Sequence, residues 1–474
     1  MLNPSRQHHP GFVQMAACLG FVVVLIDVSV VNVALDALRA TFHADVTGLQ
    51  WVVNAYALVF ASSLLMAGAL GDRFGAKRVF MTGFAIFTLT SLGCGVAHSL
   101  QALIVWRLAQ GAGAALLVPN SLSVLRQAFQ DLAARHRAIG WWGAGGGIAL
   151  AAGPVLGGLL VDTFGWRSIF LINVPIGLVG IGMTARYALN SPAQPGRSLD
   201  LPAQLTGAFA LATLTFALTE ASGLGWASPV ILIALALCAA LGVLFLWLEA
   251  RNPAAMLPLS LFSDRIVAST TALGMIVNLV FYGMVFTFSL LFQSIWHLTP
   301  QRTGLAFLPM MAILMVMNII AGRLLSRIGA RALTTAGLLI ASAGYLLMLP
   351  ALMKHSYGLL VLPMLLAGGG IALVVPTITN ALMTAVSGTQ SGIASGLLNA
   401  ARQIGGVIGV ALFGFFVRHT EAPLFMRGME QALIVSAALL IAGVVLGFFG
   451  LVAPTHETSK KPRGTYRGST RGAG

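Results

Sequence analysis

Long apolar segments alternate with short polar ones along almost the whole chain. A helix needs roughly 20 mostly apolar residues to cross a bilayer, so each segment of this length predicts one crossing. The first segment is too long for the apolar core of a signal peptide, and we expect the protein to retain it. The pattern predicts fourteen transmembrane helices, over residues 12–37, 49–69, 78–97, 102–125, 138–162, 166–188, 202–221, 227–248, 268–292, 302–326, 332–350, 358–383, 394–418 and 431–452.

Composition supports an all-α integral membrane protein. The 474 residues are 58% hydrophobic and only 8% charged, whereas an ordinary soluble chain carries about 25% charged residues. A soluble enzyme of this size is therefore excluded, and we predict no enzymatic activity. The formal net charge of +14 does not indicate nucleic-acid binding, because the basic residues lie between apolar segments, where they orient helices.

Basic residues concentrate in every second polar segment, including Arg73, Arg135 and Arg327, and in the tail after residue 452. Such loops remain on the cytoplasmic side. The alternation predicts both termini in the cytoplasm, which requires an even number of spans. The basic tail over 453–474 is expected to be disordered.

Two polar turns share one pattern. Residues 68–78 read GALGDRFGAKR, and residues 322–331 read GRLLSRIGAR at a similar offset within a second group of helices. The repeat predicts two six-helix bundles with a functional site at their interface. The predicted organisation is a cytoplasmic N-terminus over 1–11, a first bundle over 12–188, a linker with two inserted helices over 189–267, and a second bundle over 268–452.

The first of these turns is a candidate gating element. Glycine permits a tight reversal, while charges there can hold helix ends together in one conformation and release them in another. The alternative is a turn that only anchors the topology. The candidate gating residues are Gly68, Asp72, Arg73 and Gly75.

Several motifs together resemble the major facilitator superfamily, in particular its fourteen-helix drug:proton antiporter branch. The turn at 68–78, RLAQGAG at 107–113 and GPVLGG at 153–158 resemble the family's motifs after helix 2, in helix 4 and in helix 5. Ala149 departs from the helix 5 pattern, which often has glycine there. The branch is indicated by LIDVSVVNVAL at 25–35, GWRSIFLINVPIG at 165–177 and RQIGGVIG at 402–409.

One acid, Asp27, lies well inside a predicted span. Desolvation disfavours a charged carboxylate, so a carboxyl at this depth can take up and release a proton. Arg107 is the basic residue deep in the first bundle, and its depth differs from that of Asp27 by roughly 8 Å. We expect Asp27 to carry the proton, and Arg107 either to tune the pKa of Asp27 or to compete for this carboxylate when the transporter changes state, as the resemblance also implies. The alternative is a static buried ion pair.

Glycine and proline shape the fifth span. Pro154 removes a helical hydrogen bond and kinks the helix, and bare glycine faces allow close helix packing. The resemblance implies that this face lies between the two bundles and limits leak, while packing alone remains the alternative. The residues concerned are Gly153, Pro154, Gly157 and Gly158.

Polar and aromatic side chains at membrane depth are candidates for a substrate cavity, although each can equally bond between helices. Arg402 either lines the cavity or extends to the cytoplasmic face. The candidates are Asn32, Asn54, Gln110, Asn120, Asn278, Tyr282, Gln293, Asn318, Asn380, Asn399, Arg402 and Gln403.

The sequence therefore predicts a proton-coupled efflux antiporter of the bacterial inner membrane, which exports amphipathic small molecules. The alternatives are a dedicated exporter of an endogenous metabolite or antibiotic, and a membrane subunit of a larger export assembly with a periplasmic adaptor protein. Neither a metal site nor a cofactor is predicted. Cys18, Cys94 and Cys238 lack metal-ligand spacing, and no GxxxxGK[ST] phosphate loop is present. The expected energy source is the proton gradient.

Overall fold

The computed structural model describes residues 9–190, 200–252, 259–386, 390–419 and 421–451. All regular elements in these ranges are helical, as the apolar pattern predicts. The tail over 453–474, which the sequence predicts to be disordered, lies outside the described residues. Most of the N-terminal segment over 1–11 also lies outside them.

The first bundle is built from eight helical elements, two of them short. Polar caps start three of the long ones: Asp45, Ser99 and Asp131 each accept a hydrogen bond from a backbone N–H three residues later, at 2.8, 3.1 and 2.7 Å. The elements are α1 (Pro10–Val33), α2 (Leu35–Phe42), α3 (Val46–Phe74), α4 (Ala76–Gly95), α5 (Leu100–Ala128), α6 (Leu132–Phe164), α7 (Ser168–Leu171) and α8 (Asn173–Tyr187).

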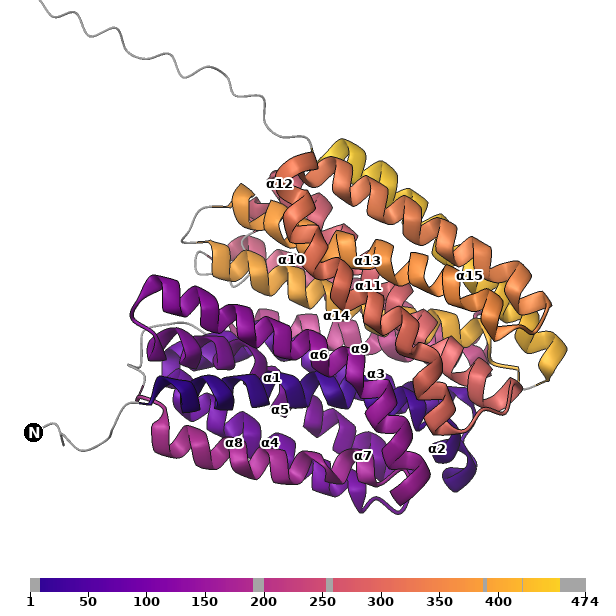
Figure 1. The fold of residues 1–474 in the computed structure, drawn as a ribbon, viewed down its shortest axis with the longest axis horizontal. Coiled ribbons are helices and arrows are strands. Elements are labelled where there is room, and N and C mark those ends of the chain that lie inside the picture. Colours follow the sequence, from indigo (N-terminus) through magenta and orange to yellow (C-terminus); the bar gives the residue numbers. More distant parts are fainter. Residues whose placement is uncertain (1–8, 191–199, 253–258, 387–389, 420, 452–474) are drawn as a thin grey trace, which may run out of the picture.

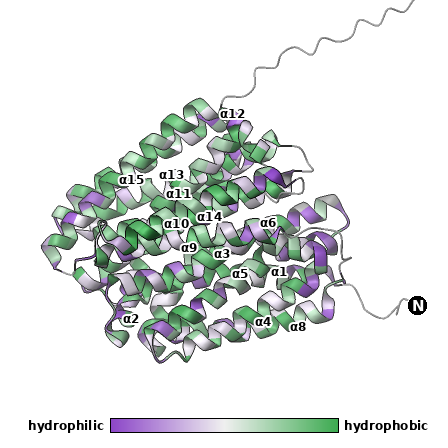
Figure 2. Cartoon of the chain, turned by 180° about the vertical axis from the view of Figure 1, so that it is seen from behind, coloured by the Kyte–Doolittle hydropathy of each residue, from purple (hydrophilic) through white to green (hydrophobic). Residues whose placement is uncertain are grey.

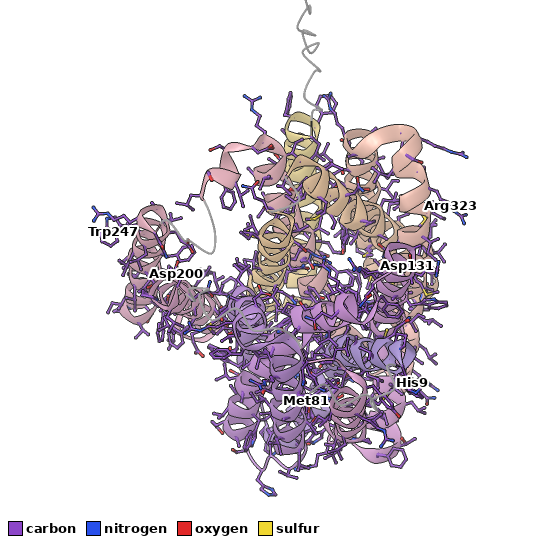
Figure 3. The ribbon with its side chains drawn as sticks, turned by 90° about the vertical axis from the view of Figure 1, so that its left-hand side faces the viewer. His9, Met81, Asp131, Asp200, Trp247 and Arg323 are labelled. Atoms are coloured by element: carbon purple, nitrogen blue, oxygen red, sulfur yellow. The ribbon has the colours of Figure 1, made fainter. Side chains whose placement is uncertain are left out.

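Two inserted helices follow, α9 (Leu201–Leu224) and α10 (Pro229–Arg251). Helix α9 packs against α3 of the first bundle and α14 of the second, whereas α10 packs mainly on α9. Figure 3 shows this pair, marked by Asp200 and Trp247, at the edge of the molecule. Most of α10 is apolar and exposed, which suits a helix surrounded by lipid.

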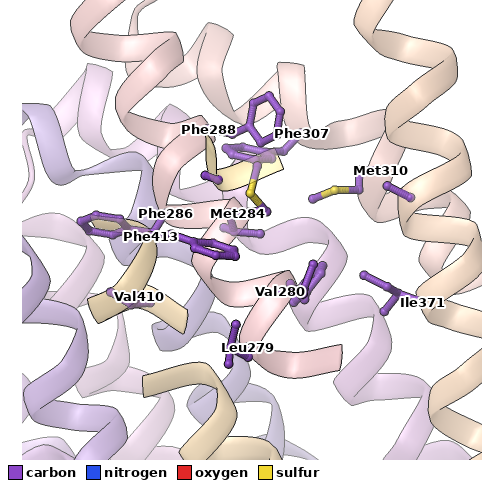
Figure 4. Packing of buried hydrophobic residues seen from close by; sticks show 14 of the residues in the cluster. Leu279, Val280, Met284, Phe286, Phe288, Phe307, Met310, Ile371, Val410 and Phe413 are labelled. Atoms are coloured by element: carbon purple, nitrogen blue, oxygen red, sulfur yellow. The ribbon is translucent and has the colours of Figure 1, made fainter. Parts of the chain in front are cut away.

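The second bundle lies beside the first, as the orange and indigo-to-magenta ribbons of Figure 1 show. Its core is apolar and closely packed around α11, with Met284, Phe286 and Phe413 among the buried side chains (Figure 4). Its elements are η1 (Leu259–Ser263), α11 (Arg265–Leu290), η2 (Leu291–Ile295), α12 (Pro300–Met353), α13 (Tyr357–Ala385), α14 (Ser391–Phe416) and α15 (Ala422–Gly450).

The number of membrane crossings agrees with the sequence. Within the described residues, 13 helices are long and apolar enough to span a membrane. One of them, α12, has 54 residues, a length of roughly 80 Å at 1.5 Å per residue, far more than a hydrocarbon core of about 30 Å. Gly329 breaks it into two helices with φ 77° and ψ 163°, so the described residues hold fourteen candidate crossings. Figure 2 shows apolar residues along the helices and polar ones mostly toward their ends.

The internal repeat is visible in the backbone. Gly75, with φ 93°, and Gly329, with φ 77°, are equivalent in the two aligned turns. Two residues later, Lys77 donates to the carbonyl oxygens of Ala185 and Ala188 at 3.0 and 2.7 Å, at the end of α8. The equivalent Arg331 stacks 3.7 Å from the ring centre of Phe448, near the end of α15. The first turn therefore fastens α4 to α8, and the second fastens the part of α12 after Gly329 to α15.

The polar bonds between the two bundles gather at one end of the molecule. We call it the closed end, and it holds the turns at 43–45, 165–167 and 297–299. There Gln50 donates to the carbonyl oxygens of Val410 and Ala411 at 3.0 and 2.9 Å. The backbone N–H of Gln301 donates to Asp162 at 3.0 Å. These bonds tie α3 to α14 and α6 to α12.

We predict that Gly329→Ala destabilises the protein by about 1–3 kcal/mol, because this backbone region is nearly restricted to glycine. The matched control is Gly322→Ala. At both glycines an added Cβ would have no heavy atom within 4 Å, but Gly322 has ordinary helical backbone. The control should be neutral or stabilising. Thermal unfolding in detergent checks both, and equal melting temperatures for the two variants would contradict the strained turn.

Candidate functional site

Asp27 is completely buried, with 0% exposure, in the interior of the first bundle. It forms an ion pair with Nη1 of Arg107. Its other carboxylate oxygen accepts from Nε2 of Gln110 at 2.9 Å and from Nδ2 of Asn173 at 3.2 Å. Three donors thus surround a carboxylate that has no access to water in this state.

Arg107, with 1% exposure, is held as tightly as its partner. Its Nε donates to the Val52 carbonyl oxygen at 3.1 Å, and its Nη1 donates to Gln110 at 2.7 Å. The guanidinium carbon lies 4.3 Å from the ring centre of Tyr56, a distance typical of cation–π contacts. The hydrogen bonds and the stacked ring fix the orientation of the guanidinium.

Ser91 and Asn173 belong to this network, although neither was a candidate from sequence. Ser91 Oγ accepts from Gln110 at 2.7 Å and from Asn173 at 3.3 Å. The network therefore joins α1, α4, α5 and α8. Asn173 was visible within the motif at 165–177, but a lone serine in an apolar span carries no comparable signal.

A small cavity of about 30 Å³ lies between the two bundles, enough for about one water molecule. Arg107 reaches its wall but Asp27 does not, so Arg107 is the member of the ion pair that faces the cavity. The amide oxygen of Asn54 and the hydroxyl of Tyr56 are buried there without a hydrogen-bond partner in the described part of the chain. The wall consists of Val28, Val31, Val53, Asn54, Tyr56, Ala57, Phe60, Arg107, Tyr282, Gln403, Gly406 and Val410.

The remaining cavity candidates occupy several environments. Asn54, Tyr282 and Gln403 line the cavity, and Gln110 orients Asp27. Asn32 and Gln293 lie at the closed end, where the Asn32 carbonyl oxygen accepts from Ser289 and from Gln293 at 3.4 Å.

Other candidates lie away from this cavity wall. Asn120 donates to the Ala67 carbonyl oxygen at 3.0 Å and joins α5 to α3. Asn278 bonds within its own helix, at 3.0 Å to the Gly274 carbonyl oxygen. Asn318, Asn380 and Asn399 are exposed, and the role of each in substrate binding stays a prediction.

The glycine face of α6 packs closely against two helices, α1 and α12. A Cβ at Gly157 would lie 2.9 Å from the Cβ of Val30 on α1, and one at Gly158 would lie 2.4 Å from the Pro300 carbonyl oxygen on α12. Gly153 lies against Ser29, and the Pro154 carbonyl oxygen faces Gly304 of α12. Gly158 and Pro154 therefore lie at the contact between the bundles.

The candidate gating turn has a glycine-dependent backbone. Gly75 has a positive φ of 93°, whereas Gly68 lies in helix with Pro119 about 4.0 Å from an added Cβ. Asp72 is half-buried, and the guanidinium of Arg73 lies 5.5 Å from the Phe74 ring centre. The part these residues play in gating stays a prediction.

We predict that Arg107→Gln lowers stability by about 3–5 kcal/mol, because it leaves a buried carboxylate without its partner. Asp27→Asn should also destabilise, and the double variant should lose less than the two single losses combined. A carboxylate can be neutralised by a proton but a guanidinium cannot. Acidification should therefore restore stability to Arg107→Gln and not to Asp27→Asn, as measured by thermal unfolding across pH. Additive losses with identical pH dependence would contradict this coupling.

Comparisons with known proteins give this geometry its context. The family model described as Major Facilitator Superfamily matches residues 17–410 and 271–468. The methylenomycin A resistance protein of Streptomyces coelicolor is 36% identical over 441 residues, covering 93% of this chain and 92% of that protein. The multidrug resistance protein Stp of Mycobacterium tuberculosis is 38% identical over 400 residues, covering 84% and 74% respectively.

Solved structures share the fold at low sequence identity. A bacterial homologue of the human lysosomal transporter Spinster, inward-facing and occupied, has a TM-score of 0.67 at 16% identity and covers 95% of this chain and 97% of its own. An auto-inhibited peptide transporter of the POT family has a TM-score of 0.64 at 17% identity, with 93% and 94% coverage. Together with this shared fold, the family model and the two relatives show that the chain belongs to the Major Facilitator Superfamily and is a multi-pass membrane transporter, not an enzyme.

Proposed function

We propose that this transporter is a proton-coupled efflux antiporter, which exports amphipathic small molecules from the cytoplasm by alternating access. The observation that carries the proposal is a buried Asp27–Arg107 ion pair whose arginine faces the cavity between two bundles. The proposed location is the bacterial inner membrane, with both termini in the cytoplasm and the closed end on the outer side.

Proton coupling follows from competition for one carboxylate. A proton on Asp27 removes the charge that holds Arg107, and the guanidinium is then free to move farther into the cavity whose wall it already lines. Release of the proton restores the ion pair. Substrate and proton need only favour different conformations by a few kcal/mol for their movements to be coupled.

Alternating access requires the contact at the closed end to separate. Gly158 and Gly304 bring α6 and α12 into backbone contact there, which seals this end. Farther along α6, Gly140, Gly143 and Gly147 have nothing within 4 Å of an added Cβ. We infer that these bare positions become the contact when the bundles rock the other way.

The names of several relatives favour efflux of toxic compounds. They include a multidrug resistance protein and a drug efflux pump. A second candidate function, export of one endogenous antibiotic, is favoured by the methylenomycin A resistance protein and by the tetracenomycin C resistance and export protein of Streptomyces glaucescens, which is 30% identical.

Proteoliposomes with an imposed pH gradient test the function. We predict that the parent protein moves an amphipathic dye against its concentration gradient and that dissipation of the pH gradient stops this movement. Asp27→Asn should lose proton-driven transport and retain dye exchange without a gradient, because it lacks the titrating group. Proton-driven transport by Asp27→Asn at the parent rate would exclude Asp27 as the proton site.

We predict that Gly158→Leu abolishes transport while the protein still folds, because its side chain holds α6 and α12 apart at the closed end. The control is Gly182→Leu on α8, where the backbone is exposed and an added Cβ has no neighbour within 4 Å. Gel filtration checks folding, and the dye assay checks transport. Full transport by Gly158→Leu would show that this end need not close.

A further inference from the structure

The charges around the cavity are not balanced. Asp27 and Arg107 form the one salt bridge within the described residues. Because the two residues carry opposite charges in contact, their charges cancel. Glu220 on α9 accepts a hydrogen bond from Trp51 at 2.8 Å and is not on the cavity wall. The residues of the wall include no acid, and Arg107 is the charged residue among them. A further cation, Arg402, lies beside the wall.

Arg402 is placed next to the cavity by the packing of α14 on α11. It lies one helical turn before Gly406, so the two residues share a helix face. Gly406 is on the cavity wall and packs against Tyr282, while Gln403, the residue after Arg402, also lines the wall. The stem of Arg402 packs over Gly274, with its Cγ 3.2 Å from where a Cβ would be.

The depth of Arg402 argues against a role as a topology anchor. It lies eleven residues into α14, and Gly274 lies nine residues into α11. At 1.5 Å per residue these positions are roughly 14–17 Å from the helix ends, about half the thickness of a hydrocarbon core. The Nε of Arg402 is buried and has no hydrogen-bond partner among the described residues.

Arg402 is half-buried. A cation at this depth without a charged partner is costly, and an anion that binds beside it removes much of that cost. We propose that Arg402 binds the anionic group of the substrate and that the transported compounds are amphipathic monoanions such as carboxylates and sulfonates. Tyr282 and Gln403 supply neutral hydrogen-bond donors beside it. The apolar wall formed by Val28, Val31 and Phe60 receives the hydrophobic part once movement of the bundles has widened the cavity, which in this state holds about one water molecule. This inference rests on the proposed function and defines its substrate class.

The charge of the substrate sets the electrical character of transport. Export of one monoanion in exchange for one proton moves two elementary charges, whereas export of a monocation for one proton moves none. An inside-negative membrane potential therefore accelerates export of the proposed substrates, and it leaves exchange of a monocation unaffected.

Three dyes of different charge test the inference in proteoliposomes with an imposed pH gradient: anilinonaphthalene sulfonate as the monoanion, N-phenylnaphthylamine as the neutral probe and ethidium as the cation. We expect the parent to move the anion about tenfold faster than ethidium, and an inside-negative potential to accelerate it further. Arg402→Gln should slow the anion by about tenfold or more, because a charge-assisted contact is lost, and should leave the neutral probe within about twofold.

Two variants make the result specific. Arg402→Lys keeps the charge and should restore part of the anion transport, which also shows that the site tolerates substitution. Arg323→Gln removes the same charge from an exposed position on α12, which Figure 3 shows at the edge of the molecule, and should transport all three dyes like the parent.

The outcomes separate this inference from the proposed function. Proton-driven transport of ethidium at the rate of the anion, or an equal loss for all three dyes in Arg402→Gln, overturns the role of Arg402 and leaves the antiporter intact. Failure of the parent to move any of the three dyes in response to the pH gradient overturns the proposed function itself.

Discussion

The buried ion pair between Asp27 and Arg107 is the constraint on which the first bundle depends. Two charges at membrane depth are tolerated only when they are paired and further hydrogen-bonded. Gln110 and Asn173 meet this requirement for Asp27, and the Val52 carbonyl oxygen and the Tyr56 ring contribute to it for Arg107. Since these groups come from different helices, the charge requirement also fixes how those helices pack.

The two bundles make different contributions around the cavity. The first contains the titratable carboxyl and its arginine, enclosed in a polar network. In the second, α11 and α14 approach closely because glycines replace side chains; a Cβ at Gly409 would lie 2.0 Å from the Leu279 carbonyl oxygen. This close packing places Tyr282 and Arg402 beside the cavity. The proposed division is a proton site in the first bundle and a substrate charge contact in the second.

Much of this architecture follows from the sequence, because apolar length and basic loops are direct consequences of the bilayer. The fourteen crossings and the repeated turn are of this kind, and Gly75 and Gly329 have the positive φ that a tight reversal needs. The contact between Asp27 and Arg107 was also foreseeable, since few charges lie at that depth.

The polar network was only partly predictable. The sequence predicts Gln110 as a cavity residue, whereas the structure shows that it orients Asp27. Nothing in the sequence distinguishes Ser91 from other serines within apolar helices. Asn32 and Gln293 join the bundles at the closed end, which no local pattern reveals. Such assignments depend on the rotation of each helix about its axis, and tertiary packing sets that rotation.

The most direct test of the account is to measure proton release when substrate binds to the purified transporter in weakly buffered detergent solution. If substrate binding and a proton on Asp27 favour different conformations, the parent releases protons when substrate binds. The Asp27→Asn variant then binds substrate without releasing protons. Equal proton release by the parent and by Asp27→Asn would contradict the central claim.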